Sequence, residues 1–347
     1  MRQKQAYFEP MQLEKNVSLK SFNTFGLDQH AEFFTEVSSA AELIETLTWA
    51  DENNLPVKIL GGGSNILITG DIRGLVIKVN IKGITPIEET DTNVLVKVAA
   101  GENWHDFVQF AISKGWGGIE NLSLIPGTVG AAPIQNIGAY GVEIKDVFQS
   151  LEAVDRSTGR QVVFDGHSCR FGYRDSFFKQ DGRDRFVICA VTFRLSKTPA
   201  FQLSYGTVEE TMHELGYVEP TLKAVGETIC FIRQQKLPDP SKIGNAGSFF
   251  KNPVIEKTHY EKIKNEHPTL HGFPVGDGIK IPAAWLIEQS GWKGKRWGTV
   301  GVHERQPLVL VNYGSGKGRD LLYLSQSIQK SVFEKFQISL EPEVNLW

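Results

Sequence analysis

Hydrophobic residues follow two different periods along this chain, and these periods predict where its helices and strands lie. Apolar positions recur every three or four residues within 40–50, 104–112 and 320–336, which places them on one face of a helix. The last segment contributes a face made of Leu321, Leu324, Ile328, Val332 and Phe336. The sequence therefore predicts helices in these three segments, each packed through its apolar face.

Short runs of β-branched and apolar residues predict strands between the helices. In PVKILGGGSNILI (56–68), an apolar run directly follows three glycines, whereas the turn of a GxGxxG dinucleotide fold opens into a helix. We therefore expect a strand, a glycine turn and a second strand. Further strands are predicted for LVIKV (75–79), VLVKVAA (94–100), LEAVD (151–155), QVVF (161–164), RFVICAVTFRL (185–195) and QISLEPEV (337–344). The runs between 151 and 194 favour a mainly antiparallel α+β region.

The segment SLIPGTVGAAPIQNIGAYG (123–141) differs from its surroundings in having many glycines and small residues. This composition does not suit a packed helix or a regular strand, because glycine is conformationally free and small side chains bury little surface. We expect a loop that lies close against a ligand.

Length and composition indicate a folded protein with more than one domain. The chain has 347 residues, more than a single hydrophobic core usually serves. Hydrophobic residues make up 41% and charged residues 22%, close to the averages of soluble globular proteins. Composition changes after KLPDPSK (236–242), which predicts a domain boundary near Leu237.

Charge and special residue types narrow the class of protein. A net charge of −3 argues against a nucleic-acid binder and leaves only local anion sites. The three cysteines are far apart without ligand spacing, so we expect reduced thiols. No metal site is predicted, because Pro268 opposes a helix joining His267 to His271. No segment has the roughly 18 apolar residues of a membrane span, so we expect a cytoplasmic protein that binds no membrane.

Two glycine-rich loops, GGGSN (61–65) and IPGTVGAAP (125–133), are candidates for phosphate binding. Glycine backbones can present successive N–H groups to an oxyanion. Tight hairpins use the same residues, so one such loop alone is a weak signal. Two loops match the two phosphates of a pyrophosphate, which indicates a ligand of dinucleotide size.

Three further stretches carry candidate catalytic side chains, and each has a simpler alternative. RFGYRDSFFK (170–179) places Arg174 next to Asp175, either as a surface ion pair or as a grip on a carboxylate or oxyanion. In NAGSFFKNP (245–253), Ser248 lacks a GxSxG context, so it is either a capping serine or an oriented proton donor. In the predicted last strand, Glu341 and Glu343 share a face, and spacing does not choose between them.

Eight ordered motifs resemble one family, the UDP-N-acetylenolpyruvoylglucosamine reductases. They are NTFG (23–26), GGGSN, AGENW (100–104), PIQNIGAYG (133–141), CRFGYRDS (169–176), KLPDP (236–240), GNAGSFFKNP (244–253) and LEPEV (340–344). The resemblance covers nearly the whole chain. It is to the subclass of this family that has a tyrosine-bearing loop. It implies an α+β, FAD-binding fold of the vanillyl-alcohol-oxidase (VAO) or PCMH-like kind, with two subdomains (1–84 with 338–347, and 85–237) and a C-terminal substrate-binding domain (238–337).

The activity implied by the resemblance is an NADPH-dependent reduction in peptidoglycan synthesis. NADPH reduces FAD, and hydride then passes from flavin N5 to C3 of the enolpyruvyl group of UDP-N-acetylglucosamine enolpyruvate. A proton added to C2 completes UDP-N-acetylmuramate. The cofactor supplies the hydride chemistry, and the protein positions the alkene and stabilises charge. We expect a monomer that binds these small molecules.

The family's functional residues transfer to this chain motif by motif. Its proton donor matches Ser248, its catalytic arginine Arg174 and its C-terminal glutamate Glu343. The implied cofactor-binding residues are Gly61, Gly62, Gly63, Ser64, Asn65, Ile125, Pro126, Gly127, Gly130, Ala131, Gln135, Asn136, Gly138, Ala139, Tyr140 and Arg233. The implied substrate-binding residues are Tyr173, Tyr205, Lys236, Asn252 and Gln289. Ala131 and Ala132 stand where some relatives carry serines, which affects individual flavin contacts.

Two rival hypotheses remain from the sequence. One is another oxidoreductase of the same flavin fold, but such enzymes often attach flavin through His or Cys, and neither lies in the glycine loops. The other is a nucleotide-sugar-binding protein without turnover. Arg174, Ser248 and Glu343 together disfavour it, because a binding protein needs no proton donor.

Overall fold

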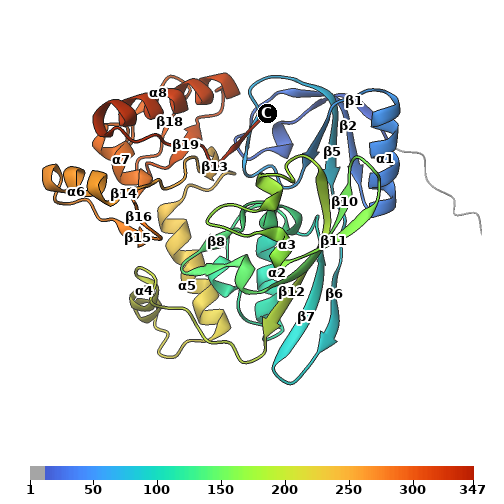
Figure 1. The fold of residues 1–347 in the computed structure, drawn as a ribbon, viewed down its shortest axis with the longest axis horizontal. Coiled ribbons are helices and arrows are strands. Elements are labelled where there is room, and N and C mark those ends of the chain that lie inside the picture. Colours follow the sequence, from blue (N-terminus) through green and yellow to red (C-terminus); the bar gives the residue numbers. More distant parts are fainter. Residues whose placement is uncertain (1–11) are drawn as a thin grey trace, which may run out of the picture.

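The computed structural model describes residues 12–347, which form two sheet-based units on one side and a smaller α+β unit on the other (Figure 1). The first unit is a four-stranded sheet in the order β1-β2-β5-β3, with β2, β5 and β3 parallel. Its strands are β1 (Glu14–Ser18), β2 (His30–Val37), β3 (Val57–Leu60) and β5 (Ile72–Val79). Helix α1 (Ala40–Glu52) covers one face through buried Leu43, Leu47 and Ala50.

The second unit is an antiparallel five-stranded sheet in the order β11-β10-β12-β7-β6. Its strands are β6 (Ile84–Glu89), β7 (Asn93–Ala99), β10 (Phe148–Asp155), β11 (Gln161–Asp165) and β12 (Phe186–Ser196). The helices of this part are α2 (Trp104–Ser113), α3 (Gly166–Cys169), α4 (Val208–Glu214) and α5 (Leu222–Lys236). Buried Trp104 and Phe107 of α2 pack on Phe193 of β12, with ring centroids 5.2–5.8 Å apart.

Short 3-10 helices and a two-stranded hairpin fill the connections of these two units. They are η1 (Lys20–Phe22), η2 (Glu120–Leu122), η3 (Val129–Gln135), η4 (Ile144–Asp146), η5 (Phe177–Lys179), β8 (Gly138–Ala139) and β9 (Val142–Glu143). The expectation of an irregular loop over 123–141 is therefore wrong in part. Its small residues permit the tight 3-10 turn of η3, which encloses Pro133.

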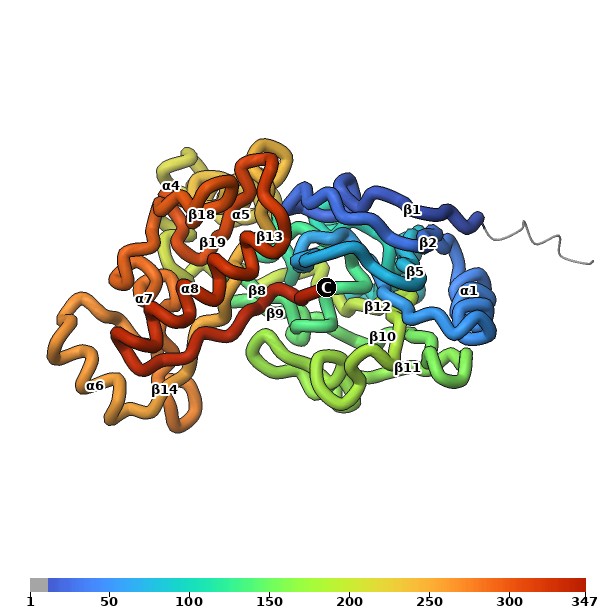
Figure 2. The backbone as a smooth tube through the Cα atoms, turned by 90° about the horizontal axis from the view of Figure 1, so that it is seen from above, coloured from blue at the N-terminus to red at the C-terminus, as the bar shows by residue number. Residues whose placement is uncertain are grey.

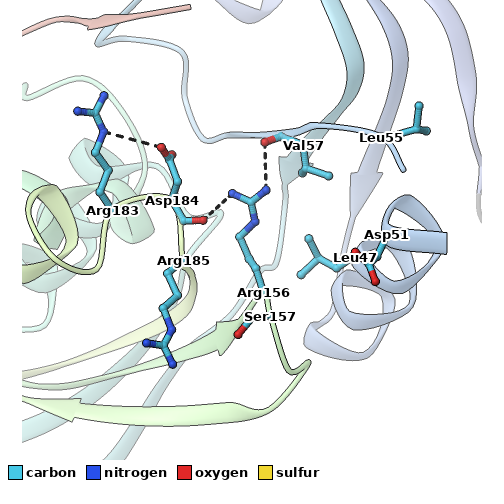
Figure 3. A pocket seen from close by; sticks show the side chains of 9 residues that line it. All are labelled: Leu47, Asp51, Leu55, Val57, Arg156, Ser157, Arg183, Asp184 and Arg185. Atoms are coloured by element: carbon cyan, nitrogen blue, oxygen red, sulfur yellow. Dashed lines mark hydrogen bonds and ion pairs between the residues drawn. The ribbon is translucent and has the colours of Figure 1, made fainter. Parts of the chain in front are cut away.

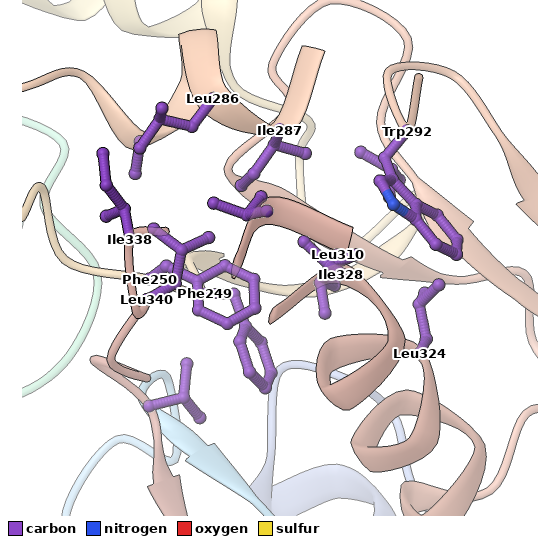
Figure 4. Packing of buried hydrophobic residues seen from close by; sticks show 14 of the residues in the cluster. Phe249, Phe250, Leu286, Ile287, Trp292, Leu310, Leu324, Ile328, Ile338 and Leu340 are labelled. Carbon is purple, nitrogen blue, oxygen red and sulfur yellow. The ribbon is translucent and has the colours of Figure 1, made fainter. Parts of the chain in front are cut away.

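The third unit contains two small sheets, the first of which packs against α8 (Gly318–Phe336). One sheet has the order β13-β19-β18-β17 and the other β14-β16-β15. Their strands are β13 (Gly244–Ser248), β14 (Val254–Glu256), β15 (Phe273–Val275), β16 (Gly278–Lys280), β17 (Arg296–Trp297), β18 (Val300–Val302) and β19 (Val309–Asn312). Helices α6 (Lys257–Glu266) and α7 (Ala283–Gln289) complete it. The core gathers Phe249, Phe250, Leu286, Leu310, Leu324 and Ile328 (Figure 4).

The C-terminal segment leaves the third unit after α8 and returns to the first (Figure 2). There β20 (Asn345–Leu346) pairs in parallel with β4 (Ile66–Leu67). The predicted strand over 337–344 is wrong: with the partners that residues 12–347 offer, the segment makes a single isolated bridge, Phe250 with Pro342. Glu341 and Glu343 accordingly do not share an environment: their side chains are 76% and 13% exposed.

The other predicted elements are confirmed. Periodicity placed the three helices of 40–50, 104–112 and 320–336 within a few residues of α1, α2 and α8. The strand–turn–strand prediction over 56–68 corresponds to β3 and β4, and the strands between 151 and 194 are antiparallel. Among residues 12–347, none of the helices combines the length and apolar character that crossing a membrane requires.

Candidate active site

The two glycine-rich loops predicted to bind phosphate lie in direct contact with one another. A Cβ atom added to Gly62 would lie 2.8 Å from Gly127 Cα, and one added to Gly61 would lie 2.8 Å from Thr128 Oγ1. Only glycine permits this approach. We call residues 61–65 and 125–131 the glycine-loop pair.

The glycine-loop pair offers unused hydrogen-bond donors. Within residues 12–347, the main-chain N–H groups of Gly62, Gly63 and Ser64 donate to no protein acceptor. Beside Tyr140, the Arg233 Nε atom in α5 is buried without a hydrogen-bond partner among the described residues, although buried donors are normally satisfied. Burial is the largest cause lowering the Arg233 pKa. These donors suit a ligand with phosphate and carbonyl oxygens, and FAD fits that description.

Arg174 lies at the tip of a tight turn in the second unit. Gly172 N–H donates to the Asp175 carbonyl at 3.0 Å, and Asp175 N–H donates back at 3.3 Å. Arg174 adopts φ +53°, a left-handed conformation that is uncommon outside glycine. Its Nη2 donates to the Gly138 carbonyl of β8 at 2.6 Å. The strained turn therefore holds the guanidinium against β8.

Ser248 ends β13 in the third unit, where a register shift separates Asn245 from Ser248 along β19. Gly247 absorbs the irregularity with φ +68°, and its N–H is held by Asn245 Oδ1 at 3.0 Å. On the other side, Phe249 and Phe250 are each only 1% exposed (Figure 4). Because Asn245 holds Gly247 and the core holds Phe249, the Ser248 hydroxyl has a defined position at the edge of the unit.

Main-chain pairing places Glu343 opposite Phe249, the residue that follows Ser248. Glu343 N–H donates to the Phe249 carbonyl at 2.8 Å, and Lys251 N–H donates to the Glu341 carbonyl at 2.9 Å. Arg174 Nε then lies 3.6 Å from Glu343 Oε1. The second unit, the third unit and the C-terminal segment thus each contribute one of the three predicted catalytic residues.

Glu343 is a buried carboxyl group with several cations around it. Burial raises its pKa, and the charges of Arg174, Lys179 and Lys251 partly oppose this effect. Gln135 Nε2 donates to Glu343 Oε1 at 3.3 Å, and Asn65 Nδ2 donates to Gln135 Oε1 at 3.0 Å. A short chain of amides therefore connects the carboxylate to the glycine-loop pair.

Three tyrosines lie on the same side of the site. The rings of Tyr140 and Tyr205 are 6.1 Å apart, and Tyr205, in the loop before α4, is 57% exposed. Tyr173 is 39% exposed, with Lys280 Nζ 4.6 Å from its ring centroid. Burial is the largest cause raising the pKa of both Tyr140 and Tyr173. The phenols of Tyr140 and Tyr173 therefore remain neutral donors at neutral pH.

The other predicted substrate contacts differ in how closely they join this group. A hydrogen bond with Asn252 is among the causes that act on the Tyr173 pKa, and Asn252 Oδ1 accepts from the Ala283 N–H of α7 at 2.9 Å. Lys236 is exposed in the last turn of α5. Gln289 ends α7, and its carbonyl accepts from Lys335 at 2.5 Å, so its main chain contacts α8.

The remaining predicted cofactor residues lie along one path of the chain. Asn136 and Tyr140 have φ of +44° and +49°, and such strained residues often gather at functional sites. Asn136 Nδ2 donates to the Gly172 carbonyl at 2.9 Å, which joins this path to the turn of Arg174. Ile125, Pro126, Gly130, Ala131, Gly138 and Ala139 belong to the same segment, between η2 and β9.

Sequence reasoning missed two cations of this site, Lys179 and Lys251. Both act on the Glu343 carboxyl through their charge. Each stands within a stretch already identified, at the ends of RFGYRDSFFK and GSFFK. The sequence signal for them was a lysine at the end of each stretch. The two stretches are far apart in the chain, and only the fold brings both lysines to one carboxylate.

Comparisons with known proteins agree with this architecture. The UDP-N-acetylenolpyruvoylglucosamine reductase C-terminal domain family matches residues 239–347, and an FAD binding domain family matches residues 31–165. A crystal structure of UDP-N-acetylenolpyruvylglucosamine reductase from Thermus caldophilus has a TM-score of 0.68 at 24% identity, covering 97% of this chain and 99% of that one. The predicted α+β, FAD-binding fold with a C-terminal domain is confirmed.

Two curated relatives extend the match over nearly the full length. UDP-N-acetylenolpyruvoylglucosamine reductase of Pseudomonas savastanoi pv. phaseolicola is 50% identical over 338 residues, 97% of this chain and 99% of the relative. The enzyme of the same name from Amoebophilus asiaticus is 49% identical over 337 residues, with the same coverage of both chains. The chain belongs to the UDP-N-acetylenolpyruvoylglucosamine reductase family.

Proposed function

We propose that this chain, as an FAD-dependent oxidoreductase, reduces the enolpyruvyl group of UDP-N-acetylglucosamine enolpyruvate to UDP-N-acetylmuramate, with NADPH as the reductant. The observation that carries the proposal is the position of Glu343, which lies 3.6 Å from Arg174 Nε and pairs through its main chain with Phe249, the residue after Ser248. Gln135 and Asn65 connect the same carboxyl group to the glycine-loop pair. The relatives' shared name supports the substrate. Peptidoglycan synthesis is the process served, and a cytoplasmic monomer is the proposed form.

FAD is the cofactor that the residues fit. Main-chain N–H groups of the glycine-loop pair would hold its phosphates, and the buried Arg233 guanidinium would face a carbonyl or phosphate oxygen. The rest of the flavin site would be lined by Ile125, Pro126, Gly127, Gly130, Ala131, Gln135, Asn136, Gly138, Ala139 and Tyr140. When bound, FAD accepts hydride from NADPH and supplies it to C3 of the substrate.

Arg174 and Ser248 divide the work on the substrate. The Arg174 guanidinium would hold the substrate carboxylate and stabilise the negative charge that develops when hydride reaches C3. The Ser248 hydroxyl then donates its proton to C2, so that a hydride and a proton are added across the carbon–carbon double bond. Glu343, 3.6 Å from Arg174 Nε, would keep the guanidinium oriented.

The nucleotide part of the substrate would lie beside the tyrosines. Tyr173, Tyr205 and Asn252 offer hydrogen-bond donors, and Lys236 offers a charge for the pyrophosphate. Gln289 is included through the resemblance alone, since its main chain contacts α8. Residues 1–84 with 338–347, 85–237 and 238–337 are the proposed subdomains, and the packing of β20 on β4 supports joining the C-terminus to the first of them.

An anaerobic absorbance experiment tests the proposed function. The purified protein with FAD is expected to lose its flavin absorbance on addition of NADPH and to recover it only after UDP-N-acetylglucosamine enolpyruvate is added. Bleaching without recovery would point to another oxidoreductase of the same fold. A protein that takes up no FAD would instead favour a binding protein without turnover.

The proton-donor role has a separate test. Ser248→Ala is expected to bind FAD and to be reduced by NADPH as the unaltered protein is, while reoxidation by the enolpyruvyl substrate slows by about 10²–10⁴-fold, the range for loss of a general acid. Ser327→Ala, in the exposed face of α8, serves as the matched control. Normal reoxidation in Ser248→Ala would exclude the hydroxyl as the donor.

A further inference from the structure

Lys179 is a half-buried lysine beside the Arg174 turn without a close carboxylate partner. It ends η5, and its Nζ lies 3.4 Å from the Arg174 carbonyl oxygen. No ion pair within 4 Å involves it among residues 12–347. Lys251 differs, because its Nζ lies 3.6 Å from Glu341 Oε2. The charge of Lys179 is therefore the less neutralised of the two.

The short helix η5, which carries Lys179, is held in place by a cap and by packing. Ser176 Oγ caps η5 by accepting from the Phe178 N–H at 3.1 Å, and it donates to the Ile134 carbonyl of η3 at 2.7 Å. Phe178 is 4% exposed and packs against Phe164 with ring centroids 5.0 Å apart. Because η3 also ends at Gln135, which contacts Glu343, the lysine and the carboxylate are held by the same short helix.

The charged groups around Lys179 leave Glu343 as its available counter-charge. Arg174 and Lys251 repel its ammonium group, while Glu343 and Asp175 attract it. Asp175 is already engaged, because Gln180 Nε2 donates to its two oxygens at 2.8 and 3.0 Å and the Ser176 N–H donates at 2.9 Å. Burial is the largest cause lowering the Lys179 pKa, which is the cost of holding this charge inside the protein.

We propose that Lys179 is a positioning residue for Glu343: its ammonium charge, fixed beside the Arg174 turn, keeps the buried Glu343 side chain ionised and thereby oriented on Arg174. Ionised Glu343 attracts Arg174 Nε, and Arg174 Nη2 already donates to the Gly138 carbonyl. Nη1 is then the guanidinium nitrogen left for a substrate carboxylate. This consequence for catalysis rests on the proposed function. The effect on Glu343 itself does not depend on it.

The direct test measures the Glu343 carboxyl group rather than turnover. Protein labelled with ¹³C at glutamate carboxyl carbons is titrated by NMR, and the Glu343→Gln variant assigns the resonance. In Lys179→Gln the Glu343 midpoint is expected at higher pH than in the unaltered protein, because an attracting cation is lost. Lys179→Arg keeps the charge and is expected to restore the original midpoint.

Lys251→Gln is the matched control for removing a nearby cation. Its charge is partly neutralised by Glu341, so its loss is expected to move the Glu343 midpoint less than loss of Lys179. An unchanged midpoint in Lys179→Gln, or an equal movement in Lys251→Gln, would overturn the proposal. If Lys179→Gln does not fold, Lys179→Met removes the same charge. Its Glu343 midpoint is then measured and compared with that of Lys251→Gln in the same way.

The pH profile of turnover separates positioning from a structural role. In Lys179→Gln the acidic limb of the kcat profile is expected to move to higher pH, with kcat recovering as pH rises and Glu343 ionises. A loss of kcat that is the same at every pH would indicate structural damage and would contradict the proposal. Should the unaltered protein not turn over the enolpyruvyl substrate at all, the proposed function fails, and the NMR titration still decides the role of Lys179.

Discussion

Two groups of positively charged side chains in this molecule use their charge in opposite ways. At the candidate active site, Arg174, Lys179 and Lys251 surround one buried carboxylate, and Arg174 Nε stays 3.6 Å from it. Elsewhere, a cavity beside α1, at the end of β10 and the start of β12, is lined by Arg156, Arg183 and Arg185 (Figure 3). We call this second group the arginine cavity.

The groups that line or adjoin the arginine cavity have protein partners at close range. Arg185 donates to Asp155 Oδ2 from Nε at 3.1 Å and from Nη2 at 2.8 Å, and Ser157 donates to Asp155 Oδ1. Arg156 donates to the Asp184 carbonyl at 2.7 Å and to the Val57 carbonyl at 3.1 Å. Charges satisfied by the fold stabilise it, whereas charges left incompletely paired are available to a ligand.

The largest expected difference between the two groups is in the effect of a mutation on turnover. Arg174→Ala is expected to lower kcat by about 10²–10³-fold, the range for losing one preorganised donor to a developing oxyanion. Steady-state reduction of the enolpyruvyl substrate measures it. Arg183→Ala, whose side chain is 70% exposed in the arginine cavity, is the matched control and is expected to retain activity. Comparable losses in both variants would remove the functional distinction between the two groups.

For stability, we expect mutations in the arginine cavity to have the larger effect. Arg156 joins the second unit to the first through Val57, so Arg156→Ala removes two charge-assisted hydrogen bonds and is expected to lower the free energy of unfolding by about 2 kcal/mol. Urea unfolding followed by circular dichroism measures this change. Arg183→Ala again serves as the control, with an expected change within about 0.5 kcal/mol. An unaltered midpoint in Arg156→Ala would show that the link between units contributes nothing.

The sequence predicted those features whose signal lies within one short segment, and it did not predict features that depend on contacts between distant segments. Helical periodicity located α1, α2 and α8, because each packs one continuous face on a core. Motifs located Arg174, Ser248 and Glu343. Their meeting depends on the pairing of 249–251 with 341–343, a contact between segments about ninety residues apart in the chain, for which local spacing carries no information.

The C-terminal segment shows why one local prediction was wrong. Ile338 and Leu340 are buried while Ser339 and Glu341 are exposed, so the alternation that indicated a strand is real. Within the described part of the chain, no neighbouring strand lies along 337–341 to complete a ladder, and the alternation ends at Pro342. Glu343 could therefore be separated from Glu341 only by the tertiary contacts that bury it. The arginine cavity gave no sequence signal, since Arg156, Arg183 and Arg185 resemble ordinary surface residues between strands.

The smallest expected effect concerns pH and belongs to the arginine cavity. Hydrogen bonds from Arg185 and from Ser157 lower the pKa of Asp155 to about 2. A carboxyl group whose pKa is lower in the folded than in the unfolded state stabilises the fold above its unfolded value near 4, and this contribution is lost as pH falls toward 2. Asp155→Asn is therefore expected to reduce stability at neutral pH and to flatten the decline of the thermal midpoint between pH 4 and pH 2. Thermal unfolding across that window measures both, and Asp181→Asn, at an exposed pair with Arg170, is the control. If the thermal midpoint of Asp155→Asn declines as steeply with falling pH, then carboxyl groups other than Asp155 determine the stability in acid.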